Sequence, residues 1–185
     1  MLFRLLLVLA FAFSLAGCAS LSESECQVGD WYSIGKSDGY SGYVSYERLG
    51  KHNKACREHG IAIDQQQYQL GYQAGLADYC TFQRGLSEGK GGKTYAGVCQ
   101  GDSDIIFREG YALGQKYYQV SSKINTLKRD NARLENEMKK VAAGSGEFYK
   151  YDGEIKANLR EITLLSVRLG EVQSELSRAS ASAGF

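Results

Sequence analysis

The chain has 185 residues, which is enough for one compact domain and an extension. Its 22 Lys and Arg residues nearly balance 21 Asp and Glu residues, and no basic stripe is present. Because phosphate binding needs concentrated positive charge, these features argue against nucleic acid as a partner. The sequence has no proline, which favours long helices over turn-rich sheets.

Residues 1–17 are typical of a signal peptide. Arg4 precedes an apolar run, residues 5–16, that is too short to cross a bilayer as a mature helix. The run ends in the letters LAGC, residues 15–18, which resemble the lipobox of bacterial lipoproteins. This resemblance implies cleavage before Cys18 and its acylation, with palmitate among the acyl groups. An ordinary secretory signal, cut at a small-residue site, is the alternative.

Acylation of Cys18 would hold the mature chain, 185 minus 17 or 168 residues, on a membrane that it does not span. Ala19 follows the cysteine, whereas the inner-membrane retention signal is usually Asp. The resemblance to Gram-negative lipoproteins therefore implies the periplasmic face of the outer membrane, with the membrane as a partner through the lipid anchor. Residues 18–25 are expected to form a lipidated tether, because residues 19–25 are small and polar.

Four further cysteines predict two disulfides in an oxidising compartment. They are Cys26, Cys56, Cys80 and Cys99. Four cysteines allow three sets of pairs, and the sequence leaves these open. We favour Cys26–Cys56 and Cys80–Cys99, because each bond would close a short loop between neighbouring elements.

One pattern occurs four times: an aromatic residue with glycine three and seven positions later. The copies are Tyr32, Gly35 and Gly39; Tyr68, Gly71 and Gly75; Phe82, Gly85 and Gly89; and Phe107, Gly110 and Gly114. In a helix these three positions share one face. Glycine costs up to about 1 kcal/mol in a helix interior, so we expect a compensating close approach of another helix along this groove.

Two other structures compete with helix packing as the explanation of the glycine pattern. Polar and charged residues within the repeats exclude a lipid-facing helix. A β-hairpin repeat remains an alternative, although period-two alternation is missing. Residues shortly before the aromatics are expected to cap the helices; they are Asp30, Asp64, Thr81 and Asp104.

The composition changes near residue 120, which divides a cysteine-bearing core, residues 26–120, from a charged, leucine-bearing extension, residues 121–178. Steps of three and four predict a first seam of Ile124, Leu127, Asn131, Leu134, Met138 and Val141, and a second of Ile155, Leu159, Ile162, Leu165, Leu169, Val172 and Leu176. The glycine-rich segment between them, residues 144–153, predicts an antiparallel hairpin. Pairing between chains, and thus an oligomer through the hairpin, is the alternative.

The face of the fourth repeat continues into the first seam, which predicts one helix from about Ser103 to Val141. A short tail, residues 179–185, is expected to fray. The fold class expected is therefore mainly α: a small disulfide-stabilised helical core with Gly/Tyr repeats, followed by a coiled-coil-like helical hairpin.

Several motifs in order resemble a bacterial lipoprotein family of unknown function, domain of unknown function 2799. They are CQVGDWYSIGKSDGYSG, HNKACREHGI, YQLGYQAGLADYC and GKGGKTYAGVC, within residues 26–118. The resemblance rests on spaced Gly, Tyr and Cys positions. It implies a domain but no activity.

Sequence motifs for catalysis are weak in this chain. His52, Cys56 and His59 share a helical face and are a conceivable zinc set, but a disulfide at Cys56 is the better interpretation, so no metal or cofactor is expected. Catalytic Ser, His and Asp residues, or paired carboxylates, meet only in the fold, and no nucleophile-elbow motif is present. No catalytic residue is therefore predicted.

The function expected is a structural or protein-binding role in the cell envelope, with an envelope protein or the cell wall as partner. The alternative is an envelope enzyme such as a cell-wall hydrolase. Structure discriminates between these classes. A deep cleft with converging carboxylates, or a His and Ser pair, would favour the enzyme; a solid helical core with an exposed apolar arm would favour the binding protein.

Overall fold

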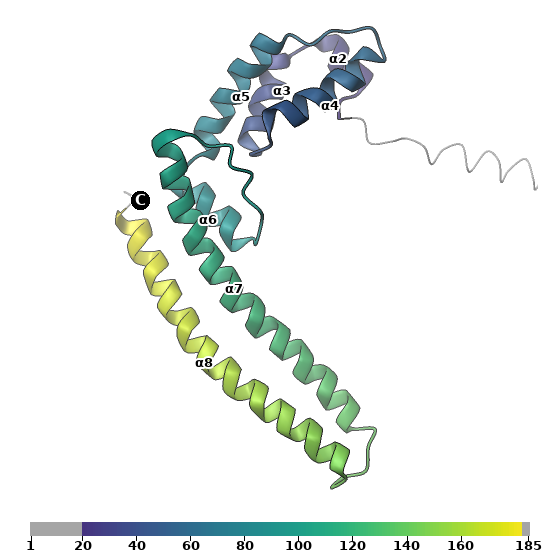
Figure 1. The fold of residues 1–185 in the computed structure, drawn as a ribbon, viewed down its shortest axis with the longest axis vertical. Coiled ribbons are helices and arrows are strands. Elements are labelled where there is room, and N and C mark those ends of the chain that lie inside the picture. The colour runs from purple at the N-terminus through teal and green to yellow at the C-terminus, as the bar shows by residue number, and fades with distance from the viewer. Residues whose placement is uncertain (1–19, 183–185) are drawn as a thin grey trace, which may run out of the picture. The chain divides into compact units, whose positions relative to one another are not determined.

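The computed structural model describes residues 20–182, which form helices and, within that range, no strand (Figure 1). The helices are α2 (Glu23–Val28), α3 (Trp31–Tyr40), α4 (Ser45–Arg57), α5 (Gln65–Tyr79), α6 (Phe82–Lys90), α7 (Gly101–Met138) and α8 (Gly146–Ser182). This confirms the mainly α fold. Among the residues described, no helix combines the length and apolar character needed to cross a membrane. The predicted lipidation site, Cys18, lies outside the described residues.

The chain divides after Tyr79 into two compact units. The first unit contains α2 to α5, and the second contains α6 to α8. The predicted boundary near residue 120 is not where the chain divides. Because α7 runs without a break through residue 120, the last glycine repeat and the start of the hairpin belong to the same helix.

Each unit contains one pair of parallel helices, α3 with α5 and α6 with α7. In the first pair, Gly35 lies against the carbonyl group of Tyr68, and Gly39, one turn later, lies against that of Tyr72. Contacts that advance in the same direction along both helices establish the parallel orientation. The predicted glycine-floored groove is therefore confirmed.

The close approach is reciprocal. A Cβ atom added at Gly71 would meet the carbonyl oxygen of Tyr32, and one added at Gly75 would meet that of Lys36. In the second pair the same contacts join Gly85, Gly89, Gly110 and Gly114 to the carbonyl oxygens of Phe107, Tyr111, Phe82 and Leu86. Such geometry is typical of Cα–H···O contacts between helices, which only a residue without a side chain permits.

The two helix pairs are two versions of one structural element. Gly42 has φ +69° and lies against the ring of Tyr79, while Gly92 has φ +67° and lies against the ring of Tyr118. In α5 and in α7, the tyrosine directly after the first glycine of the repeat also makes the same kind of hydrogen bond in both pairs. Tyr72 donates to the carbonyl group of Tyr43, and Tyr111 donates to that of Lys93, both at 2.7 Å.

Each unit holds one disulfide. Cys26–Cys56 joins α2 to α4, and Cys80–Cys99 joins the start of α6 to the loop before α7. The favoured pairing is therefore confirmed. It leaves no cysteine in the described residues free to react.

The folded part of the first unit begins at a lower residue number than predicted. Leu21 is buried. Ser22 caps α2 in a capping box, in which its side chain accepts from the amide of Glu25 while the Glu25 carboxylate accepts from the amide of Ser22. The predicted tether over residues 18–25 is therefore wrong from Ser20 onwards, because these residues pack against the core.

Three of the four predicted caps are confirmed. Asp30 and Thr81 cap α3 and α6, and Asp64 accepts from the amide of Gln67 in the first turn of α5. Asp104 is not a cap, because α7 begins at Gly101 and places Asp104 inside the helix. Its carboxylate instead binds Tyr95 and Arg108, at 2.6 Å in each case.

The hairpin is formed by α7 and α8 of the same chain. Asn158 donates to the side-chain oxygen of Asn131 at 2.8 Å across the seam, where Asn131 is buried. Buried apolar residues flank this bond; they are Val120, Ile124, Leu127, Leu134, Val172 and Leu176. Near the end of α8, Val172 and Leu176 pack with Leu86 of α6. The antiparallel intrachain pairing is confirmed.

Two details of the hairpin differ from the prediction. Leu159 is 52% exposed, so it lies outside the seam. The last helix continues to Ser182, so the predicted tail from residue 179 is helical up to that point. In α7 the predicted bounds, about Ser103 to Val141, agree closely with the observed Gly101–Met138.

Candidate functional site

A buried carboxylate, Asp38, lies at the centre of the first unit. It is 4% exposed and is contacted from α4 and α5. Its Oδ1 atom accepts from Nε of Arg48 at 3.0 Å. Its Oδ2 atom accepts from the hydroxyl group of Tyr68 at 2.9 Å and lies 2.8 Å from Nε2 of His52. Asp38 directly precedes Gly39, and the close approach of α5 to α3 at Gly35 and Gly39 brings Tyr68 within reach.

The charge of Asp38 is stabilised by its partners. Burial raises the pKa of this carboxyl group, but the hydrogen bonds from His52 and Tyr68 and the charge of Arg48 outweigh burial and hold the pKa below its usual range. The pKa of the Tyr68 hydroxyl group is raised, first by burial and then by the charge of Asp38. Asp38 is therefore ionised and Tyr68 is a protonated donor at neutral pH.

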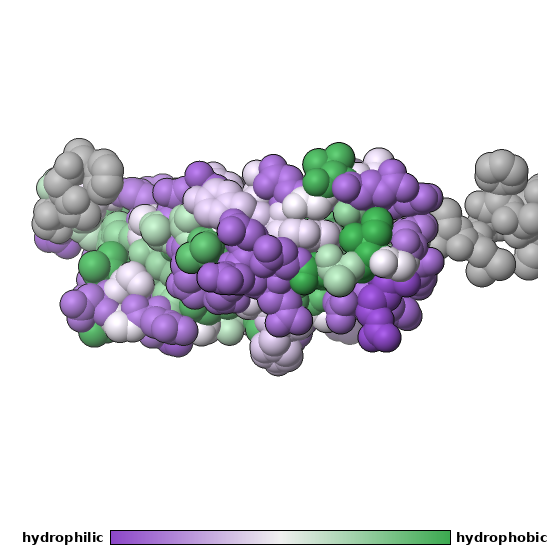
Figure 2. Space-filling model, turned by 90° about the horizontal axis from the view of Figure 1, so that it is seen from above, coloured by the Kyte–Doolittle hydropathy of each residue, from purple (hydrophilic) through white to green (hydrophobic). Residues whose placement is uncertain are grey.

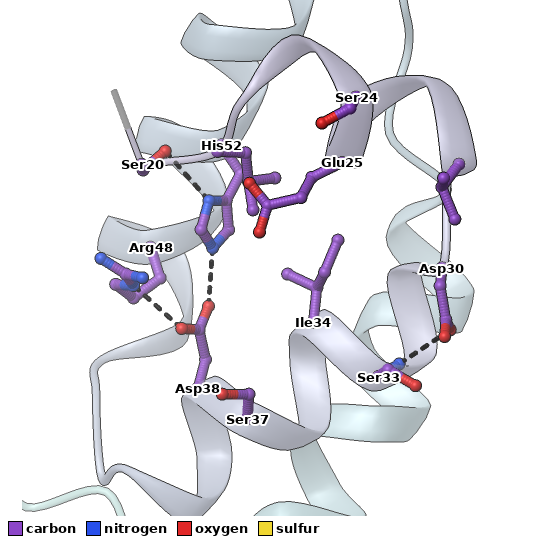
Figure 3. Close-up of a pocket in the computed structure, with 12 residues that line it drawn as sticks. Ser20, Ser24, Glu25, Asp30, Ser33, Ile34, Ser37, Asp38, Arg48 and His52 are labelled. Atoms are coloured by element: carbon purple, nitrogen blue, oxygen red, sulfur yellow. Dashed lines mark hydrogen bonds and ion pairs between the residues drawn. The ribbon is translucent and has the colours of Figure 1, made fainter. Parts of the chain in front are cut away.

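His52 connects Asp38 to the N-terminal segment. The imidazole ring is 1% exposed, and its Nδ1 atom lies 3.0 Å from Oγ of Ser20 (Figure 3). Because an ionised carboxylate only accepts hydrogen bonds, Nε2 donates to Asp38, and Nδ1 shares the second hydrogen bond with the hydroxyl group of Ser20. Ser20, His52 and Asp38 thus form one hydrogen-bonded chain.

A pocket of about 460 Å³ lies beside these three hydrogen-bonded side chains. It is lined by residues of α2, α3 and α4 and by the segment before α2. Figure 3 shows Ser20, His52 and Asp38 on one side of the pocket and Asp30 with Ser33 on the other. The lining combines serine hydroxyls and carboxylates with a few apolar side chains. Most of the surface that these residues present to the pocket is nonetheless apolar, and the volume suits a small molecule.

The order Ser, His, Asp is that of a nucleophile with its base and the group that orients the base. Catalysis of acyl transfer also needs hydrogen-bond donors for the developing oxyanion. Two backbone amides near the pocket, those of Ser22 and Ser33, already donate to Glu25 and Asp30. In addition, Asp38 is shared among three donors, one of them cationic, which reduces its ability to stabilise a charged imidazole.

The second unit shows which part of the network the fold itself requires. Glu88 holds the place of Asp38, directly before the second glycine of its repeat, and is also buried. Its carboxylate pairs with Arg84 and Lys93, at 3.0 Å in each case. A buried, paired carboxylate therefore belongs to both helix pairs. Only the first unit adds His52, and at the position of Tyr68 the second has Phe107, which has no hydroxyl group.

The zinc alternative is wrong. Cys56 is bonded to Cys26, His52 points to Asp38, and His59 lies 3.7 Å from a carboxylate oxygen of Glu23. Over residues 20–182, no group of three His, Cys, Asp or Glu side chains is arranged to hold a metal ion.

The hairpin exposes apolar side chains away from its seam. Leu164 is 73% exposed and Val167 is 63% exposed, both on α8. At about 100° per residue, Val167 lies about 140° from Val172 and about 180° from Leu176 around α8, and Leu164 lies about 80° and about 120° from them. On the face of the molecule shown in Figure 2, hydrophobic residues form patches separated by hydrophilic ones.

The network around Asp38 was not predicted from the sequence. A signal for it does exist, because the repeats YSIGKSDG and FQRGLSEG both place an acidic residue directly before the second glycine. An acid on a face that packs against another helix is a buried acid, and it needs partners. The identity of the partners is set by the fold, since Ser20, His52 and Tyr68 come from three distant segments.

These observations define a mainly α-helical protein of two glycine-packed helix pairs with a hairpin extension. Residues 30–116 match the family described as "Protein of unknown function (DUF2799)". The matched segment covers α3 to α6 and the first part of α7, and so includes the glycine contacts of both helix pairs. Comparison with curated proteins and with solved structures finds no match.

Proposed function

We propose that the protein is an outer-membrane-anchored periplasmic lipoprotein whose helical hairpin binds another envelope protein. The LAGC sequence supports the anchor. The two disulfides suit an oxidising compartment, where such bonds persist. The role is structural or protein-binding rather than catalytic.

The observation that carries the proposal is the exposed apolar face of α8. The hairpin is firmly joined to its unit, because α7 is both the partner of α6 and the first helix of the hairpin. Leu164 and Val167 therefore stand on a rigid support. Apolar side chains gain most from an apolar partner, so a protein fits this face better than the polar glycan strands of the cell wall.

Photo-crosslinking in the intact envelope tests this role. A benzophenone side chain at position 164 should give one discrete adduct with an envelope protein, and Val167→Asp in the same chain should remove that adduct. The matched control carries the probe at Lys150, an exposed polar position on the same helix. A probe at position 164 that captures no more than the probe at position 150 would contradict the proposal.

The second candidate function is an envelope hydrolase, favoured by the His and Ser pair beside the pocket. A fluorophosphonate probe labels serine residues that act as nucleophiles. Under the binding proposal the purified chain stays unlabelled. Labelling that Ser20→Ala and His52→Asn abolish, and that Ser24→Ala in the same pocket leaves intact, would instead establish the hydrolase.

A further inference from the structure

The first described residues are fixed to the first unit. Ser20 is held by the hydrogen bond to buried His52, and Leu21 is itself buried. The capping box at Ser22 and the Cys26–Cys56 bond fix the segment that follows. From Ser20 onwards, no flexible linker separates the described residues from the core of the first unit.

The predicted lipid-bearing residue is very near this fixed point. Only Ala19 separates Cys18 from Ser20. Consecutive Cα atoms are about 3.8 Å apart, so the Cα atom of Cys18 lies within about 7.6 Å of the Cα atom of Ser20. Acyl chains on Cys18 must enter the hydrocarbon of the bilayer, which places this cysteine at the level of the headgroups.

We infer that the first unit rests directly on a phospholipid bilayer, with α2 and the Ser20 side of the pocket at the surface of the headgroups. The inference rests on the lipid anchor proposed above and adds an interaction surface to it. A lipoprotein with a long linker can stand away from its membrane. This chain cannot, because its linker is a single residue.

The chemistry of α2 indicates which lipid surface fits. The helix has Glu23 and Glu25 in its first turn and no basic residue in its last turn, and Asp30 follows it. An anionic surface would repel these carboxylates, whereas a zwitterionic phospholipid such as phosphatidylethanolamine offers ammonium groups to them. Val28, 77% exposed on α2 and part of the pocket lining, is the apolar side chain placed to contact the lipid.

The test uses the full chain, with acylation at Cys18 verified by mass, in vesicles of phosphatidylethanolamine and phosphatidylcholine. A benzophenone side chain at position 28 should form adducts with lipid on illumination. One control carries the probe at Leu70, which is exposed on α5 and does not line the pocket. The other inserts ten Gly and Ser residues between Ala19 and Ser20, which adds a mean reach of about 17 Å.

The expected result is lipid adducts at position 28 in the parent chain, a several-fold lower yield with the inserted linker, and few adducts at position 70. If the yield of lipid adducts at position 28 in the acylated chain did not change with the inserted linker, the contact between the first unit and the bilayer would be refuted, and the anchor would stay intact. A chain without acyl groups on Cys18 would refute the anchor, and with it the contact between the first unit and the bilayer.

Discussion

At the residue scale, Asp38 illustrates how this fold uses a buried charge. A buried carboxylate is costly unless its charge is paired and its oxygens are bonded. Here three donors from two helices satisfy both oxygens, so the charge holds α4 and α5 against α3. The carboxylate stabilises the first unit only while it is ionised, which gives a test by pH.

Asp38→Asn should lower the free energy of unfolding at pH 7, by about 1–3 kcal/mol for each buried partner left unsatisfied. The pKa of Asp38 is lowered in the folded state. Its contribution is therefore complete above the unfolded pKa, about 3.9, and is lost as the pH falls through the lower folded value. Urea unfolding of both proteins between pH 7 and pH 3 measures this difference.

The expected result is a constant difference down to about pH 4, followed by a decrease. A difference that instead grows as the pH falls from 7 toward 4 would show that burial dominates and that the carboxyl pKa is raised. Glu88→Gln is the matched control in the second unit, where the carboxylate is paired with Arg84 and Lys93 instead.

At the element scale, the glycine face determines how the helices pair. Gly71→Ala should destabilise the first unit by about 1–3 kcal/mol, because the added Cβ meets the carbonyl oxygen of Tyr32. Gly50→Ala is the matched control, since Gly50 also lies within a helix but has open space around its Cβ position. It should stabilise the protein by up to about 1 kcal/mol.

Thermal unfolding followed by circular dichroism measures both variants. Opposite signs for the two substitutions are expected. If Gly71→Ala were as stable as Gly50→Ala, the close contact between α3 and α5 would be refuted.

The polar pair in the hairpin gives a second prediction at this scale. Asn131→Ala should cost about 1–3 kcal/mol, because it leaves the half-buried side-chain amide of Asn158 without its acceptor. Replacing both residues by Leu should restore or increase stability, since no polar group then remains unpaired. A double-mutant cycle in urea measures the coupling, and additive effects of the two substitutions would contradict the bond.

Much of the secondary structure was predictable, and the reason lies in spacing. Steps of three and seven from each aromatic residue place it and its glycines on one helical face, which held for all four copies. The direction of pairing was not predictable, because a face with glycines one turn apart accepts a parallel or an antiparallel partner. Asp104 was misassigned as a cap, since Tyr95, from the preceding loop, takes its carboxylate.

The site was less predictable than the fold. A buried acid is implied by the repeated acidic residue before the second glycine, as in Asp38 and Glu88. Its partners are contacts between distant segments: Ser20 and His52 are 32 residues apart, and Tyr68 is 30 residues from Asp38. Spacing along the chain carries no signal for such contacts.

At the scale of the whole molecule, each unit has its own helix pair and its own disulfide. Replacing Cys26 and Cys56 by Ser should therefore destabilise the first unit, by about 2–4 kcal/mol, and leave the second unaffected. Hydrogen exchange resolves the two units. Protection should fall in α3 and α5 and persist in α6 and α7, and equal loss in both pairs would show that the units unfold together.

The central claim is that the protein is lipid-anchored in the outer membrane, and the mass of its mature N-terminal peptide tests this most directly. The protein is purified from outer-membrane fractions of a Gram-negative host and compared with Cys18→Ser. The expected peptide begins at Cys18 and carries acyl groups on the sulfur atom and on the amino group of this residue. The variant is expected to stay unprocessed. An unmodified terminus at any other residue would contradict the anchor and the functional proposal that depends on it.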